Sequence, residues 1–271
     1  MTEKFAVIGH PVAHSQSPAL HQAFAAQHSI ELDYSLIDCA PAQFDSTVMQ
    51  FFATGGRGLN VTLPHKAAAF LLAHQVGMRA RLANAANTLY YSGEVLLGDN
   101  TDGTGLVRDL VGNLQLDLRD SHIVIIGAGG AARGIAAPLL GLWPARLTIA
   151  NRTVERAVAL AENLSGLGNV HARALDHLQD ERCDVVINAT AASLSGQIPV
   201  LNLDVSGAIA YDIVYATRPT LFMDWADQHG AAASHDGWGM LVEQAAESFY
   251  LWHQVWPDTR PMIDDRKAYA R

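Results

Sequence analysis

The amino-acid sequence predicts an α/β fold with two domains. Short apolar runs alternate with helical stretches almost from end to end, which is the pattern of proteins built on parallel sheets. The chain has 271 residues, and at about 150 residues per domain this length favours two compact units. Hydrophobic residues make up 49% and charged residues 17% of the chain, so the composition is that of a globular protein rather than a disordered one.

The first part of the chain is expected to form one α/β unit that ends with a hairpin. Ser17 is a good N-cap and Pro18 suits the first helical position, so a helix is predicted to open there. Another helix is expected after Pro41. The remaining elements predicted here are strands at 4–8, 32–37 and 58–62, a helix at 64–73, and a hairpin of 87–91 and 94–97 turned at Ser92-Gly93.

A second series of strands and helices follows a predicted helix at 102–112. The run Ile123–Ile126 is continuously apolar, as a strand buried on both faces of a sheet should be. By composition, the polar stretch 113–121 is the best candidate for a domain boundary, and the last helical pattern, 239–256, could pack on either unit. Further strands are predicted at 147–150, 184–187 and 208–214, and helices up to about 142 and at 154–164.

Charge and cysteine content limit the partners and the compartment. Lys and Arg number 18 against 27 Asp and Glu, a net charge of -9. Nucleic acid and anionic membranes need a broad basic surface, so neither is expected as a partner. Cys39 and Cys183 are too few for a disulfide framework, and the apolar stretch near the N-terminus is too short for a signal peptide. We therefore expect a cytoplasmic protein with no membrane span.

A glycine-rich turn predicts a dinucleotide site. The segment from Gly127 to Ala132 fits G-x-G-x-x-G/A, follows a buried strand and opens a helix, which is the context that a dinucleotide-binding turn requires. The helix N-terminus offers free N–H groups to a pyrophosphate. The alternative is a tight strand-helix turn without a ligand, and the context favours binding. The candidate residues are Gly127, Ala128, Gly129, Gly130 and Ala131.

The end of the next predicted strand indicates which dinucleotide is bound. An NAD site usually has Asp or Glu there, whereas this chain has Asn151-Arg152-Thr153 with Arg156 one turn later. A charge-assisted hydrogen bond contributes about 1.5 to 3 kcal/mol, so two arginines on a 2'-phosphate could favour NADP by about a hundredfold. The alternative is that both arginines are solvated charges at a helix start, where a cation is poorly placed without an anion.

Lys66 is the most conspicuous cation in the chain. The only other lysines are Lys4 and Lys267, and no acid lies between Asp45 and Glu94. A lysine at a predicted helix start gains nothing from the helix dipole, so Lys66 needs a distant carboxylate or a chemical role. Asp102, at another predicted helix start, is a candidate partner, although Asp is also a routine cap there.

Ser15 and Ser17 flank one residue at the end of a predicted strand. Their hydroxyls could face a polyol or carboxylate, because strand ends line the ligand crevice in open α/β sheets. From spacing alone, however, N-capping is the better explanation of Ser17. Templates for calcium, P-loop, zinc and G-x-S-x-G sites are not matched, and no metal is expected.

Taken together and in order, the motifs resemble the shikimate dehydrogenase family across nearly the whole chain. The matching segments are His14–Pro18, Asn60–Lys66, Asn87-Thr88, Gly98–Gly105, Gly127–Ala131, Asn151–Thr153, Asn188–Thr190, Asp212–Tyr215 and Asp236–Gln244.

The resemblance implies a two-domain enzyme that reduces 3-dehydroshikimate to shikimate with NADPH, in aromatic amino acid biosynthesis. The expected domains are a substrate domain, 1–103 plus 239–271, and a Rossmann-type NADP domain, 104–238, with an active-site cleft between them. A small-molecule substrate is the expected partner, and the protein should be a monomer or homodimer.

The resemblance also implies roles for individual residues. Lys66 and Asp102 are the implied catalytic pair. The implied substrate-binding residues are Ser15 and Ser17 for the carboxylate with Tyr215 nearby, and Thr62, Lys66, Asn87, Asp102 and Gln244 for the ring hydroxyls. Ile213 and Gly237 are added to the cofactor contacts.

Two departures and two rival functions accompany the resemblance. The family's usual Gly-Ala-Val-Asn-Thr is Asn84-Ala-Ala-Asn-Thr88 here, and acids common in the preceding turn are replaced by His74, Gln75 and Met78. One rival is a quinate/shikimate dehydrogenase that uses NAD or either cofactor, against which Arg152 and Arg156 speak. The other is a non-catalytic NADP-binding regulator, which could lose Lys66 or Asp102 without penalty.

Overall fold

The computed structural model describes residues 2–179, 181–190 and 201–269, and it divides the chain into two compact units. Unit 1 consists of Met1–Gly105 and Val242–Arg271, and unit 2 of Leu106–Leu241. Each unit is built on its own six-stranded sheet. Across these described ranges, no helix is both long enough and apolar enough to cross a membrane.

Unit 1 has a mixed sheet in the order β2-β1-β3-β5-β6-β4. Its first three neighbours, β2, β1 and β3, run parallel, whereas β5 is antiparallel to β3 and to β6. The antiparallel pair is the expected hairpin, turned one residue later than predicted. The strands are β1 (Glu3–Gly9), β2 (Leu32–Asp38), β3 (Gly56–Val61), β4 (Gln75–Val76), β5 (Thr88–Ser92) and β6 (Val95–Asp99).

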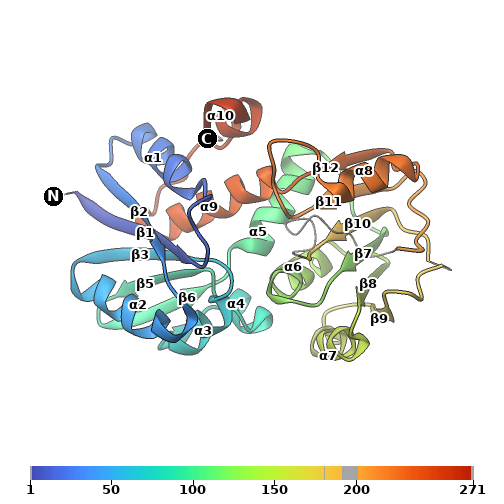
Figure 1. Cartoon of the computed structure of the whole chain (residues 1–271), viewed down its shortest axis with the longest axis horizontal. Coiled ribbons are helices and arrows are strands. Elements are labelled where there is room, and N and C mark those ends of the chain that lie inside the picture. Colours follow the sequence, from blue (N-terminus) through green and yellow to red (C-terminus); the bar gives the residue numbers. More distant parts are fainter. Residues whose placement is uncertain (1, 180, 191–200, 270–271) are drawn as a thin grey trace. The chain divides into compact units, whose positions relative to one another are not determined.

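Helices cover both faces of this sheet (Figure 1). Phe5 and Val7 point to the face covered by α1 and α9, whereas Ala6 and Ile8 point to the face covered by α2 and α3. Alternate residues of a strand therefore feed two cores. The helices of unit 1 are α1 (Ser17–Gln27), α2 (Phe44–Ala53), α3 (Lys66–Leu72), α4 (Met78–Ala83), the part of α5 (Asp102–Val107) up to Gly105, the part of α9 (Trp238–His253) from Val242 onward, α10 (Arg260–Asp264) and α11 (Arg266–Tyr269), with a 3-10 turn at Pro41–Gln43.

The start of α1 differs from the expectation. The helix begins at Ser17 itself, and the N-cap position is Gln16, whose side chain forms no capping hydrogen bond. The backbone N–H of Ser17 donates to Ser15 Oγ at 3.3 Å. Ser17 also accepts a hydrogen bond at its hydroxyl from Ser15 Oγ, at 3.2 Å. The prediction that Ser17 is the N-cap was therefore wrong, because the helix starts one residue earlier than expected and Ser17 is already a helical residue.

Asn84 ends α4 in a left-handed conformation, with φ 47° and ψ 38°. This is the position at which the resembled family usually has glycine, and Asn is the side chain that best tolerates that conformation after glycine. The departure from the family motif thus keeps the backbone geometry.

We expect Asn84→Ala to lower the free energy of unfolding by about 1 kcal/mol and Asn84→Gly to leave it nearly unchanged. Urea unfolding of both variants measures this, and equal stabilities would contradict it.

His21 lies in the core between α1, β2 and α9. Its ring stacks on Tyr34 at 4.5 Å and also contacts Phe249 and Trp252. It is fully buried, and neither ring nitrogen forms a hydrogen bond with a described residue. Burial, with the charge of His253 as second cause and a contact with Asn60 acting in the opposite direction, lowers the pKa of His21 to about 3.

This lowered pKa predicts loss of stability in acid. His21 stays neutral in the folded protein but takes up a proton near its ordinary pKa of 6.5 when unfolded, so stability is complete above pH 6.5 and falls as the pH drops toward 3. Between pH 7 and 4.5, the free energy of unfolding should fall by about 2 to 3 kcal/mol less in His21→Phe than in the wild type. Urea unfolding at both pH values measures this. The exposed His177 gives a control, His177→Phe, and equal losses in all three proteins would refute the prediction.

Unit 2 has a fully parallel sheet in the order β12-β11-β10-β7-β8-β9. Counted within the unit this is the order 3-2-1-4-5-6 of the doubly wound dinucleotide-binding fold, in which the first strand, β7, lies at the point where the strand order reverses. The Rossmann-type prediction is confirmed. The strands are β7 (His122–Ile126), β8 (Arg146–Asn151), β9 (Val170–Ala174), β10 (Val185–Asn188), β11 (Ile209–Asp212) and β12 (Ala233–His235).

Helices α6 (Gly130–Leu140) and α7 (Val154–Leu164) pack on one face of this sheet, and α8 (Leu221–Gln228) packs on the other (Figure 1). The predicted helix 102–112 is α5 followed by a π-helical segment, Arg108–Asn113. The boundary that composition favoured, 113–121, was wrong, because Leu110 and Leu118 are buried in the core of unit 2 on either side of its start. The stretch therefore belongs inside that unit.

Candidate functional site

Lys66 and Asp102 form a partly buried ion pair in unit 1. Lys66 opens α3 just after β3, and Asp102 opens α5 just after β6. Nζ of Lys66 donates to Oδ2 of Asp102 at 2.6 Å, and the two side chains are only 16% and 6% exposed. The distant carboxylate that Lys66 was expected to need is thus Asp102. A partly buried lysine amino group held at a fixed point can donate a proton to a bound ligand as the ammonium, or accept one as the neutral amine.

Asn87 connects this pair to the C-terminal helix. Its Nδ2 donates to Asp102 Oδ1 and Thr101 Oγ1, both at 2.8 Å, and to Gln244 Oε1 of α9 at 3.2 Å. Asn87 Oδ1 accepts from the backbone N–H of Thr101. The structure therefore brings four of the predicted site residues, Lys66, Asp102, Asn87 and Gln244, into one hydrogen-bonded group.

The two serines and Thr62 lie at the ends of neighbouring strands in the same unit. Ser15 and Ser17 follow β1 and share a hydroxyl–hydroxyl bond, and Ser17 is 5% exposed. Thr62 follows β3. Its methyl group packs closely over Gly9, because a Cβ added to Gly9 would lie only 2.4 Å from Thr62 Cγ2. Because β1 and β3 are parallel neighbours, these hydroxyl-bearing turns come from the same edge of the sheet.

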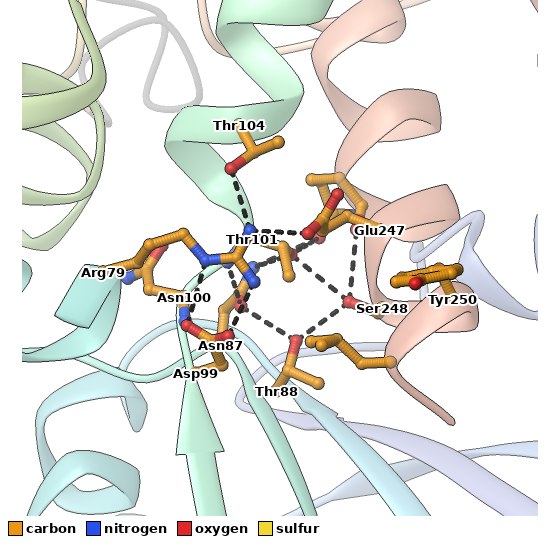
Figure 2. A network of polar contacts seen from close by, with 12 residues as sticks. Arg79, Asn87, Thr88, Asp99, Asn100, Thr101, Thr104, Glu247, Ser248 and Tyr250 are labelled. Carbon is orange, nitrogen blue, oxygen red and sulfur yellow. Dashed lines mark hydrogen bonds and ion pairs between the residues drawn. The ribbon is translucent and has the colours of Figure 1, made fainter. Parts of the chain in front are cut away.

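A further group of hydrogen-bonded polar residues, which the sequence patterns did not predict, supports Asn87 from within unit 1. Tyr34 OH donates to Asn60 Oδ1 at 2.7 Å, and Asn60 Nδ2 donates to Ser248 Oγ at 2.9 Å. Ser248 in turn lies 2.9 Å from Thr88 Oγ1, which donates to Asn87 Oδ1 (Figure 2). This group satisfies buried polar atoms and fixes the orientation of the Asn87 amide. Asn60 inside an apolar strand was the one available hint.

The glycine-rich turn of unit 2 has the geometry of a phosphate site. Gly127 follows β7 with φ 112°, a conformation that favours glycine. Within the part of the chain that the structure describes, no atom outside the adjoining backbone lies within 4 Å of where a Cβ of Gly129 or Gly130 would be. The described residues thus leave open space beside the backbone N–H groups at the start of the eleven-residue helix α6. Ala128 and Ala132 are buried, and Ala131 is partly exposed. These features fit a dinucleotide pyrophosphate.

Two exposed arginines follow β8. Asn151 ends the strand and donates from Nδ2 to the carbonyl of Thr153 at 2.8 Å, which shapes the turn into α7. Arg152 and Arg156 are exposed, and neither forms an ion pair with any residue that the structure describes. This geometry fits binding of an anionic ribose substituent.

The remaining candidates also belong to unit 2. Gly237 approaches the backbone of Ile213 so closely that a Cβ would lie 2.1 Å from the carbonyl oxygen, and its N–H donates to Val214 O at 3.1 Å. Only glycine fits there. Tyr215 packs edge-on against Trp238 with ring centroids 6.3 Å apart.

Comparison with known proteins identifies the family. Family models match three successive segments: the shikimate dehydrogenase substrate binding domain over residues 7–89, shikimate/quinate 5-dehydrogenase over 109–199, and the shikimate 5'-dehydrogenase C-terminal domain over 237–264. The sequence is 50% identical over 272 residues to shikimate dehydrogenase (NADP(+)) of Methylococcus capsulatus, covering 99% of this chain and 98% of that protein. The chain belongs to the shikimate dehydrogenase family.

Solved structures of related proteins have the same fold. The shikimate 5-dehydrogenase of Thermus thermophilus in complex with NADP(H) and shikimate aligns with a TM-score of 0.86 at 29% identity, over 99% of this chain and 100% of that one. An Ael1 enzyme from Pseudomonas putida aligns with a TM-score of 0.91 at 41% identity, over 97% and 98% of the two chains. The described residues of both units therefore share the fold of these proteins.

Proposed function

We propose that this protein catalyses the reversible NADPH-dependent reduction of 3-dehydroshikimate to shikimate, a step of chorismate and aromatic amino acid biosynthesis. The observation that carries the proposal is the partly buried Lys66–Asp102 pair, 2.6 Å apart and hydrogen-bonded through Asn87 to Gln244. A ring bearing several hydroxyls and a ketone needs such a cluster of donors and acceptors. The relatives named shikimate dehydrogenase (NADP(+)) support the same reaction.

Unit 1 is proposed to hold the substrate. Thr62, Lys66, Asn87, Asp102 and Gln244 bind the ring hydroxyls through their amide, hydroxyl and charged groups. Ser15 and Ser17 bind the carboxylate, and Tyr215 is a further proposed substrate contact. The support for the serine role is their shared hydroxyl bond at the edge of the sheet, because paired hydroxyls can turn their protons toward an anion.

Lys66 is proposed to carry the proton. NADPH, when bound, supplies the hydride to the carbonyl carbon. As the carbonyl oxygen gains negative charge, the Lys66 ammonium stabilises it and gives it a proton; in the reverse direction Lys66 takes the proton from the hydroxyl. Asp102 holds Nζ at 2.6 Å, so the donor stays at one point during the transfer.

Unit 2 is proposed to hold NADP. Gly127, Ala128, Gly129, Gly130 and Ala131 would surround the pyrophosphate, and the open space beside Gly129 and Gly130 supports this. The proposed contacts of the phosphorylated ribose are Asn151, Arg152, Thr153 and Arg156. Ile213 and Gly237 are proposed contacts for the rest of the cofactor.

Initial rates with shikimate and with quinate, each with NADP and with NAD, test the proposal. We expect turnover with shikimate and NADP, and at least tenfold lower kcat/KM for the other three pairs. Preference for quinate or NAD would favour a quinate/shikimate dehydrogenase. Tight NADPH binding without turnover would favour a non-catalytic regulator.

The buried, free thiols of Cys39 and Cys183 fit a reducing compartment. We propose the cytoplasm, and a monomer or homodimer as the working form.

A further inference from the structure

Arg79 joins three separate elements of unit 1 (Figure 2). It lies in α4, and its Nε and Nη2 donate to the two carboxylate oxygens of Asp99, at the end of β6, over 3.1 and 2.6 Å. Its Nη1 donates to Glu247 of α9 at 2.5 Å and to Thr104 of α5 at 3.1 Å. Four donor contacts of one guanidinium thus hold a strand end and two helices.

The first of these contacts leads to Asp102 through a short chain of hydrogen bonds. Asp99 Oδ1, held by Arg79, also accepts the backbone N–H of Asn100 at 2.7 Å. Asn100 Oδ1 then accepts the backbone N–H of Asp102 at 3.1 Å. Thr104 lies two residues beyond Asp102. Arg79 therefore forms hydrogen bonds with residues on both sides of Asp102, namely Asp99 before it and Thr104 after it. These bonds hold the turn from which the Asp102 carboxylate reaches Lys66.

The contact with Glu247 acts on the other half of the site. Glu247 follows Gln244 by about one helical turn, so both lie on the same side of α9. Gln244 Oε1 accepts from Asn87 at 3.2 Å, and Ser248, next to Glu247, bonds Thr88 and Asn60. Fixing Glu247 fixes the rotation of α9, and with it the Gln244 amide.

The charges of this group make Arg79 difficult to replace. Arg79, Asp99 and Glu247 are 30%, 15% and 9% exposed. Burial acts to lower the pKa of Arg79, but the hydrogen bonds that its guanidinium donates to the two carboxylates outweigh burial and raise that pKa above its ordinary value. Without the guanidinium, the carboxylates of Asp99 and Glu247, both largely shielded from solvent, would lose the cation that they share. A lysine keeps the charge but cannot form the fork on Asp99 while reaching Glu247.

We propose that Arg79 is a positioning residue for the dehydrogenase reaction: it holds Asp102 against Lys66 and Gln244 against Asn87 without touching the substrate. The inference rests on the proposed function of this site. Arg79 lies outside the motifs that match the family, and it would fix the positions of two proposed substrate contacts, Asp102 and Gln244.

Kinetics of Arg79→Met and Arg79→Lys test this role. We expect Arg79→Met to lower kcat about 10- to 100-fold and to raise the KM for shikimate several-fold, because displacement of a reacting group by about 1 Å has effects of this size. The Kd of NADP, measured by fluorescence titration, should stay within twofold. The solvent deuterium isotope effect on kcat should increase, because the misplaced pair makes proton transfer slower. Arg79→Lys should recover part of kcat.

Two further variants complete the test. Arg81→Met changes an exposed arginine of the same helix and should leave every constant unchanged. Thr104→Val removes one acceptor without removing charge, and should lower kcat about two- to fivefold; it decides the matter if Arg79→Met does not fold. Suppose that the wild type turns over but the folded Arg79 and Thr104 variants keep kcat and KM within twofold of the wild-type values, or lose NADP affinity in parallel with kcat. Either result overturns the positioning role alone. Absence of wild-type turnover overturns the proposed function and the inference with it.

Discussion

Replacement of Lys66 by alanine is expected to lower kcat by about 10² to 10⁴ with little change in cofactor affinity. The reason is that Lys66 is the group proposed to give the proton to the developing alkoxide, and its Nζ is held at a single point by Asp102. Stopped assays at saturating shikimate and NADP measure kcat, and fluorescence titration measures the Kd of NADP.

The alanine variant also leaves the Asp102 carboxylate, only 6% exposed, without its cation, which is destabilising. Urea unfolding must therefore accompany the kinetics, and rates are compared only below the unfolding transition. Lys4→Ala, at an exposed lysine of β1, is the matched control and should behave as wild type. A near-normal kcat for folded Lys66→Ala would exclude Lys66 as the acid.

Removal of both arginines after β8 is expected to abolish the preference for NADP. The double variant Arg152→Ala/Arg156→Ala should raise the KM for NADP by about a hundredfold and leave the KM for NAD within threefold, because each guanidinium contributes about 1.5 to 3 kcal/mol to a phosphate before screening, and exposure reduces this. The kcat at saturating NADP should change little, since neither residue touches the reacting atoms.

Ionic strength provides an independent measurement of the same effect. Both arginines are exposed, so the preference of the wild type for NADP should fall as salt is raised from about 0.05 to 0.5 M, and that of the double variant should not. Arg119→Ala, at another exposed arginine of unit 2, controls for a general change in surface charge. If the ratio of the KM values for NADP and NAD is unchanged in the double variant, groups other than these arginines bind the 2'-phosphate.

Elements buried on both faces were predictable because their residues are continuously apolar. The run Ile123–Ile126 is the core of β7, and the glycines after it form the turn into α6 as expected. Elements at the margins were not predicted. Strand β9 lies at an edge of its sheet, where all five residues are only partly buried, so it needs no apolar run. Helix α8 and the short α4 and β4 were also missed.

The sequence by itself determined the two-domain α/β class, the dinucleotide turn and the singular position of Lys66. Tertiary structure alone decided which groups meet: Lys66 and Asp102 are 36 residues apart, Asn87 and Gln244 157, and Arg79 and Glu247 168. Local propensities reach only a few residues along the chain. The strand order that places β3, β5 and β6 side by side, and the return of α9 to unit 1, supply these contacts, so the fold had to be known before Arg79 could be seen as part of the site.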